Sequence, residues 1–325
     1  MLLKKILLVL LLSNCLFLPL FAIEIAKIET ARAETAIIDS KKINSFQKQC
    51  ETILGSRNGC IAVLDLTQGK IITIVNPVLF KTKTVKPGSL VKILVAISAL
   101  NSGMVNPSAV YRCNGEALFD DIKFKCWTNE GHHETDMTKA LAESCNIYFY
   151  HIASKLLLSD IYRTYRLFNF GQRSPFNLSG ESPGLFQETK SDIEKYYLAA
   201  GRSENLLVTP AQMLYFISII AKRGRLLDSK IDLKSKTYDP VYNGLRNSVL
   251  NGTSQEANYI PLTPAGKTGT FSERYTTKTS AWFVGYAPFN NPEIAIVVYL
   301  EKGRGASDAA PIAKQVFKCY FELFR

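Results

Sequence analysis

A serine and a lysine stand three residues apart at the start of an apolar segment of this 325-residue chain, in the stretch Ser89-Leu90-Val91-Lys92. Serine becomes a nucleophile when a base removes its proton, and a lysine whose pKa is lowered by partial burial can act as that base. Residues 89–103 combine a serine suited to a helix N-cap, aliphatic residues at helical spacing and a closing glycine, which predicts a largely buried helix. Ser89 and Lys92 are therefore expected on one face of the helix start, where free N–H groups favour a developing oxyanion.

A second pair of polar side chains follows in Ser144-Cys145-Asn146, which places a hydroxyl two residues before an amide. The surrounding residues 136–157 have the pattern of a helix that is interrupted near Ser144. This S-x-N motif is common by itself, so its meaning depends on what the fold places beside it. For Cys145 we expect the role of a small buried residue.

A third motif, Lys267-Thr268-Gly269-Thr270, opens a run with strand character. Its lysine and threonines supply hydrogen-bond donors for a carboxylate, and its glycine lets the backbone of a ligand lie close to the strand. The three motifs together are specific because they occur in a fixed order: at a helix start, inside a helical segment, and on a later strand.

The elements that must position these motifs divide the chain into strands at both ends and helices between them. Residues 60–77 predict a hairpin, and three strand-like runs (GKTGTFS, SAWFVGYAP and EIAIVVYLE) lie near the other end. Helices are predicted at residues 159–171, 209–224 and 239–250, and for the closing segment DAAPIAKQVFKCYFELF. This pattern predicts an α+β fold, in which both chain ends form one antiparallel sheet flanked by helices, with an inserted helical subdomain.

The N-terminus has the form of an export signal. A short positive start, MLLKK, precedes 17 uncharged residues at 6–22. This run is also near the short end for a membrane span, so a cleaved signal and a retained anchor both stay open at 1–22. We expect a linker at 23–45 and a domain at 46–325 that lies outside the cytoplasm, in the periplasm or at the outer face of the cytoplasmic membrane.

The net charge and the cysteine positions bear on three further properties: nucleic-acid binding, disulfide bonds and metal binding. The net charge of +11 comes from scattered lysines without a basic block, so we expect no nucleic-acid partner. Export permits disulfides, and Cys113 with Cys126 is the first candidate pair, followed by Cys50 with Cys60. Because the chain has no C-x-x-C motif, and because His132, His133 and His151 lack a ligand-like spacing, we expect no metal and no other cofactor.

Taken together, the three motifs resemble those of the penicillin-binding transpeptidases and the serine β-lactamases. The resemblance covers about residues 58–322, includes AVLDLTQGKIITIVNP, KPGSLVKI, FKCWTNEGHH and AGKTGTFS, and is closest to the high-molecular-weight class B type. Two stretches depart from the family pattern: Gly131-His132-His133 stands where Gly-His-Gly is frequent, and Gly201-Arg202-Ser203 stands where Gly-Gln-Gly is frequent. The family's N-terminal pedestal has no counterpart in residues 23–45, and we expect any glycosyltransferase partner to be a separate protein.

The resemblance implies a peptidoglycan D,D-transpeptidase with a serine acyl-enzyme, acting on D-Ala-D-Ala stem peptides and inhibited covalently by β-lactams. It makes Ser89 the nucleophile and Lys92 its base. Ser144 would relay a proton to the leaving D-Ala, and Lys267 would polarise the site. Substrate binding would fall to Asn146, Thr268, Gly269 and Thr270, and the N–H groups of Ser89 and Thr270 would form the oxyanion hole.

Other functions stay open at this point. A D,D-carboxypeptidase would pass the same acyl group to water, and the sequence does not separate the two reactions or identify the acceptor amine. A β-lactamase is disfavoured because the chain lacks a Glu-x-x-Leu-Asn segment between the second and third motifs and has Asn146 where the class D type prefers an aliphatic residue. A β-lactam or muropeptide sensor needs more membrane segments than the single candidate, and a non-catalytic scaffold need not keep Ser89, Lys92 and Lys267.

Overall fold

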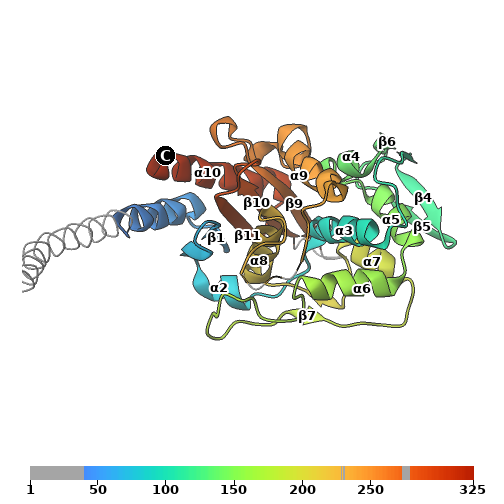
Figure 1. The fold of residues 1–325 in the computed structure, drawn as a ribbon, viewed down its shortest axis with the longest axis horizontal. Coiled ribbons are helices and arrows are strands. Elements are labelled where there is room, and N and C mark those ends of the chain that lie inside the picture. Colours follow the sequence, from blue (N-terminus) through green and yellow to red (C-terminus); the bar gives the residue numbers. More distant parts are fainter. Residues whose placement is uncertain (1–39, 228, 230, 273–278) are drawn as a thin grey trace, which may run out of the picture. The chain divides into compact units, whose positions relative to one another are not determined.

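The computed structural model describes residues 40–325 except 228, 230 and 273–278 (Figure 1). The chain divides into two units, Met1–Phe46 and Gln47–Arg325. The predicted signal or anchor at 1–22 lies outside the described residues, and the described part of the predicted linker, 40–45, belongs to a helix at residues 40–54. Within the described part of the chain, none of the helices has the length and apolar character needed to cross a membrane.

The centre of the second unit is a five-stranded antiparallel sheet with the strand order β2-β1-β11-β10-β9. Its strands are β1 (Gly59–Asp65), β2 (Lys70–Val75), β9 (Ala265–Ser272), β10 (Thr279–Ala287) and β11 (Ile294–Leu300). The N-terminal hairpin joins the C-terminal strands through β1 and β11, which pair from Gly59 opposite Leu300 to Asp65 opposite Ile294. The prediction of one sheet built from both chain ends is confirmed.

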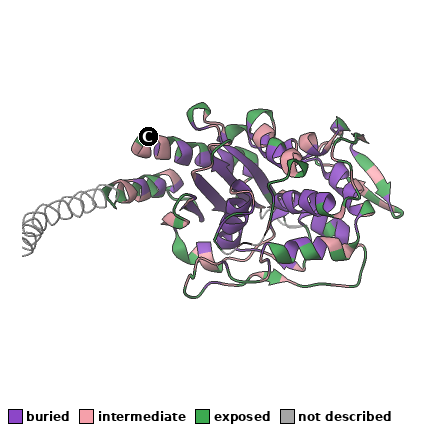
Figure 2. Cartoon of the chain, viewed as in Figure 1, coloured by how far each residue is buried: buried purple, intermediate pink, exposed green. Residues whose placement is uncertain are grey.

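Both faces of the sheet are covered, which explains why its central strands are mostly apolar. All seven residues of β11 are buried. Side chains alternate along a strand: Trp282 and Val284 of β10 belong to the core that contains α8 (Pro210–Ala221), whereas the Phe283 ring between them lies against Phe317 of α10 (Ala310–Phe324). Figure 2 shows the sheet together with α3 and α8 as the most buried part of the molecule.

The helical insertion lies between β2 and β9. It contains α2 (Pro77–Thr82), η1 (Gly88–Val91), α3 (Lys92–Ser102), α4 (Met137–Ala142), α5 (Asn146–Lys155), α6 (Leu158–Leu167), α7 (Glu194–Ala200), α8 and α9 (Asp239–Asn251), with short 3₁₀ turns η2 (Lys236–Tyr238), η3 (Gln255–Ala257) and η4 (Ile260–Leu262). The predicted interruption near Ser144 is confirmed as the gap between α4 and α5.

Two helix predictions need correction. The segment expected as one helix at 89–103 begins with the 3₁₀ turn η1, and Ser89 lies inside this turn instead of capping a helix. The helix expected at 159–171 ends at Leu167, because Asn169 and Gly171 adopt left-handed φ values of 59° and 81° that an α-helix cannot continue through.

Small two-stranded ribbons occupy residues 111–135, here called the ribbon segment. β3 (Tyr111–Cys113) pairs with β6 (His133–Thr135), and β4 (Glu116–Phe119) pairs with β5 (Ile122–Lys125). A further short pair, β7 (Leu185–Phe186) with β8 (Leu206–Leu207), lies elsewhere in the insertion. Most side chains of β3 to β6 are exposed or half-buried. The rings of Phe119 and Phe124 both pack against Tyr196, so a few aromatic contacts join the ribbon segment to the core.

Candidate active site

The turn that carries Ser89 is pressed between two other segments of the backbone. Gly88 has φ 56°, and a Cβ added to it would lie 2.8 Å from the carbonyl oxygen of Thr270. On the opposite side, a Cβ on Gly201, which ends α7, would lie 1.9 Å from the oxygen of Gly88. Ser89 lies in the 3₁₀ turn η1, three residues before Lys92 at the start of α3, and residues at this spacing in such a turn lie on one face.

Lys92 is fully buried at the start of α3, and its ammonium group is held by the S-x-N motif. Nζ donates hydrogen bonds to Ser144 O at 2.6 Å, to Ser144 Oγ at 3.2 Å and to Asn146 Oδ1 at 2.6 Å. Burial lowers the pKa of Lys92 to about 8, with a smaller lowering from the charge of Arg202. A lysine with this pKa loses its proton readily near neutral pH, as a general base must.

The S-x-N motif forms the sharp connection between α4 and α5. Ser144 has φ 58°, a left-handed conformation that non-glycine residues rarely adopt. Cys145 then caps α5, with its sulfur accepting a hydrogen bond from the N–H of Tyr148 at 3.4 Å. This geometry directs both the carbonyl and the hydroxyl of Ser144 to Lys92, which gives a physical account of the strained backbone.

Lys267 lies on β9, the edge strand beside η1, and is fully buried. Its Nζ has no hydrogen-bond partner within the described residues. Burial and then the charge of Lys92 hold the pKa of Lys267 well below its ordinary value. Two buried ammonium groups repel each other, so the proton favours Lys92, which has three acceptors.

The remaining residues of the third motif hold β9 against its neighbours. Thr268 Oγ1 contacts Thr253 Oγ1 at 3.1 Å, and the N–H of Thr268 donates to Ser254 Oγ at 3.0 Å. Thr270 Oγ1 accepts from the N–H of Gly305 at 2.9 Å, which leaves the hydroxyl proton of Thr270 available for a ligand.

Gly269 has a packing role that the sequence did not indicate. A Cβ on Gly269 would lie 2.9 Å from both Leu90 Cγ and Pro87 O, so the glycine lets the serine-bearing turn contact the strand. Three stretches far apart in the sequence therefore meet at one point.

Comparison with known proteins gives the same assignment for most of the chain. The family described as "Penicillin binding protein transpeptidase domain" matches residues 59–318. The chain belongs to this transpeptidase family. Its sheet and helical insertion are accordingly those of a β-lactamase-like fold, and the predicted fold class is confirmed.

Individual proteins that are similar to this chain are themselves named as transpeptidases or penicillin-binding proteins. The peptidoglycan D,D-transpeptidase MrdA of Acinetobacter baumannii is 27% identical, in a match that covers 81% of this chain and 51% of the relative. The peptidoglycan D,D-transpeptidase FtsI of Escherichia coli is 27% identical over 71% of this chain and 42% of the relative. A crystal structure of Pseudomonas aeruginosa PBP2 has a TM-score of 0.77 and 25% identity, covering 85% of this chain and 76% of that one. The chain spans about half the length of the curated relatives it matches.

Three contributors to the candidate site escaped sequence reasoning. Gly201 and Gly305 act through backbone contacts with the motif residues, and Ser254 positions the N–H of Thr268. Gly201 belongs to the stretch that departs from the family pattern, so that departure was the one sequence signal that pointed to it.

The thiols beside the S-x-N motif overturn one expectation. Cys113 and Cys126, the first predicted disulfide pair, are free thiols, and so are Cys50 and Cys60, the second predicted pair. With His132 and Cys145 they form a cluster whose four ligand atoms all lie within 4.8 Å of one another, here called the Cys–His cluster. Hydrogen bonding with Cys145 and then with His132 holds the pKa of the Cys126 thiol well below its ordinary value. This is a donor set that can hold a metal ion, which the irregular cysteine spacing did not indicate.

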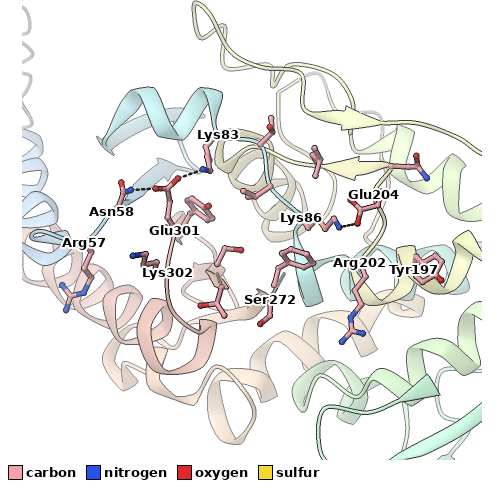
Figure 3. Close-up of a pocket in the computed structure, with 18 of the residues that line it drawn as sticks. Arg57, Asn58, Lys83, Lys86, Tyr197, Arg202, Glu204, Ser272, Glu301 and Lys302 are labelled. Atoms are coloured by element: carbon pink, nitrogen blue, oxygen red, sulfur yellow. Dashed lines mark hydrogen bonds and ion pairs between the residues drawn. The ribbon is translucent and has the colours of Figure 1, made fainter. Parts of the chain in front are cut away.

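A large cavity adjoins the site without including it. Its volume is about 1640 Å³, and it is lined by residues such as Lys86, which lies three residues before Ser89, and Phe271, which follows Thr270 (Figure 3). Lys86 forms an ion pair with Glu204 on its wall. None of the eight predicted site residues lines this cavity, so its size is not a guide to the chemistry.

Proposed function

We propose that the chain is a peptidoglycan D,D-transpeptidase: Ser89 takes the acyl group of a D-Ala-D-Ala stem peptide and passes it to an amine of a neighbouring strand. The observation that carries this proposal is the hydrogen bonding of Lys92 to Ser144 and Asn146. It joins the first two motifs at the point where the third supplies a buried Lys267. The likeness to curated D,D-transpeptidases supports the proposal for the half of those proteins that the chain spans.

The acyl-enzyme forms by addition and elimination. Neutral Lys92 removes the proton of Ser89 Oγ as this oxygen attacks the carbonyl of the penultimate D-Ala, and the N–H groups of Ser89 and Thr270 stabilise the resulting oxyanion. Ser144 relays the proton to the departing D-Ala amine, and Asn146 holds the substrate amide. The acceptor amine then attacks the ester, and Ser89 regains its proton. Penicillin follows the first half of this sequence and remains attached.

Because Lys92 and Lys267 are both buried, binding of the substrate carboxylate can change the protonation of the base, Lys92. Lys267, Thr268 and Thr270 receive the terminal carboxylate in this scheme. A carboxylate beside Lys267 stabilises its ammonium form and so raises its pKa. Because a second charge is then unfavourable at Lys92, substrate binding lowers the proton affinity of Lys92 and prepares it to accept the proton of Ser89.

The proposed setting is the outer face of the cytoplasmic membrane. Support comes from the uncharged residues 6–22, which have the form of an export signal or anchor. In that setting a separate glycosyltransferase would supply the glycan strands whose stem peptides the enzyme joins.

Intact-mass spectrometry of the full chain with a fluorescent penicillin tests the proposal. We expect a long-lived adduct on Ser89 that is absent in Ser89→Ala, with the fold of the variant checked by circular dichroism. An adduct that persists in Ser89→Ala would overturn the nucleophile assignment. Rapid turnover of the antibiotic would instead indicate a β-lactamase, and a folded protein without an adduct would indicate a non-catalytic role.

A further inference from the structure

We propose that Cys113, Cys126, His132 and Cys145 bind one structural Zn²⁺ ion. Their four ligand atoms lie within 4.8 Å of one another, and His132 Nδ1 is 3.3 Å from Cys126 Sγ and 3.8 Å from Cys113 Sγ. Two thiolates on one tetrahedral Zn²⁺ lie about 3.8 Å apart when each Zn–S bond is about 2.3 Å long. The side chains therefore need only small rotations to close around the ion.

The fold brings these four ligands together from separate elements. Cys113 ends β3, directly opposite His133 of β6, and this pairing places His132 beside it. The approach requires Gly131, whose φ is 77° and whose added Cβ would lie 2.1 Å from Cys113 O. Cys126 is fixed by its own N–H, which donates to Gly115 O at 2.7 Å.

The chemistry of the donors favours zinc. Three soft thiolates and one imidazole in a closed tetrahedral set are typical of structural zinc sites, and four protein ligands leave no open position for substrate. The sulfur of Cys145 accepts a hydrogen bond from the N–H of Tyr148 at 3.4 Å, which fixes its position at the start of the ten-residue helix α5. Cys113 and Cys145 are fully buried, so an ion there would be shielded from competing water.

A metal at this place would hold the S-x-N motif. Cys145 lies between Ser144 and Asn146, the two residues that accept hydrogen bonds from Lys92. The ribbon segment has few buried side chains of its own, and a zinc ion would tie both of its ribbons to the start of α5. Zinc would thus connect the most exposed part of the insertion to the centre of the site.

The first experiment measures metal in the full chain, purified without chelators, by inductively coupled plasma mass spectrometry. We expect about one zinc per chain. Replacement by Co²⁺ is expected to give the visible bands of a tetrahedral ion together with thiolate-to-metal charge-transfer absorption. Both readouts are independent of acylation, so the proposed transpeptidase activity could fail while the metal site stands, or the reverse.

Matched cysteine variants locate the ion. Cys126→Ser should weaken zinc binding at least about tenfold, measured by competition with a chromophoric chelator, since even outer-shell changes cost 10–100-fold in affinity. Cys319→Ser, which removes a buried thiol outside the cluster, should keep the zinc. Zinc that is unchanged in Cys126→Ser would overturn the proposal. Should that variant fail to fold, the native chain still decides: a folded protein with neither zinc nor a cobalt spectrum overturns it.

Discussion

The two regions that meet at the candidate site are held together by different forces. On one side, η1 and β9 touch backbone to backbone at glycines, inside a core where the sheet and α3 are almost completely buried. On the other side, the ribbon segment leaves Leu118 68% exposed and Trp127 60% exposed. Apolar burial can therefore fix Ser89 and Lys267, whereas the S-x-N motif adjoins a region that only a few aromatic contacts join to the core.

Lys92 is where the two regions are joined, so its removal should have the largest effect. Lys92→Ala deletes both the base and the three hydrogen bonds to the S-x-N motif. We expect acylation by penicillin to slow by about 10²–10⁴-fold, the range typical of a lost general base. Stopped-flow or gel-based labelling with a fluorescent penicillin measures this rate.

A second buried lysine provides the control for this variant. Lys195 is 6% exposed and pairs with Asp192 and Asp120, neither of which belongs to the three motifs. Lys195→Ala should acylate at nearly the native rate. A near-native rate in Lys92→Ala would show that another group removes the proton of Ser89.

The pH dependence of acylation tests the same lysine without a mutation. Burial lowers the pKa of Lys92 to about 8, and only the neutral form accepts a proton. The acylation rate should therefore rise about tenfold from pH 6 to pH 7, about fivefold from pH 7 to pH 8, and level off above, because the neutral fraction grows in that way around the pKa. The residual rate of Lys92→Ala should lack this slope, and a flat native profile over the same range would contradict the assignment.

The sequence predicted the buried region better than the ribbon segment, for a physical reason. An apolar run predicts a buried strand such as β11, and an apolar run with a cap predicts a helix such as α8. The packing of such helices on the sheet follows from the need to bury both faces of the sheet. The three motifs were found because each keeps its residues within a few positions of one another. The Cys–His cluster was missed because its ligands come from four separate elements, and Gly201 was missed because its contact with Gly88 depends on the tertiary fold.

A comparison of Gly201 with Gly103, which both end helices, separates the cost of a left-handed backbone from the cost of contact with the turn that carries Ser89. Gly201 and Gly103 have nearly the same φ, 65° and 67°, but an added Cβ meets Gly88 O at 1.9 Å in the first case and nothing within 4 Å in the second. Both alanine variants should lose about 1–2 kcal/mol from the left-handed backbone. Gly201→Ala should lose about a further 1–3 kcal/mol through overpacking and should also slow acylation.

Urea unfolding and penicillin labelling of these two glycine variants give the stability and the rate separately. Equal free energies of unfolding for Gly201→Ala and Gly103→Ala would mean that the turn can move away from α7 at little cost. In that case the buried region would be less rigid than its close backbone contacts indicate.

The smallest expected effect belongs to the ribbon segment and tests the comparison directly. Leu64 of β1 is fully buried and Leu118 of β4 is 68% exposed. Leu64→Ala should lower the free energy of unfolding by about 2–5 kcal/mol, through lost burial and the cavity left behind. Leu118→Ala should change it by less than about 0.5 kcal/mol. A large loss in Leu118→Ala, measured by the same urea titration, would mean that the outer face of the ribbon segment also contributes apolar contacts, and the contrast between the two regions would then be wrong.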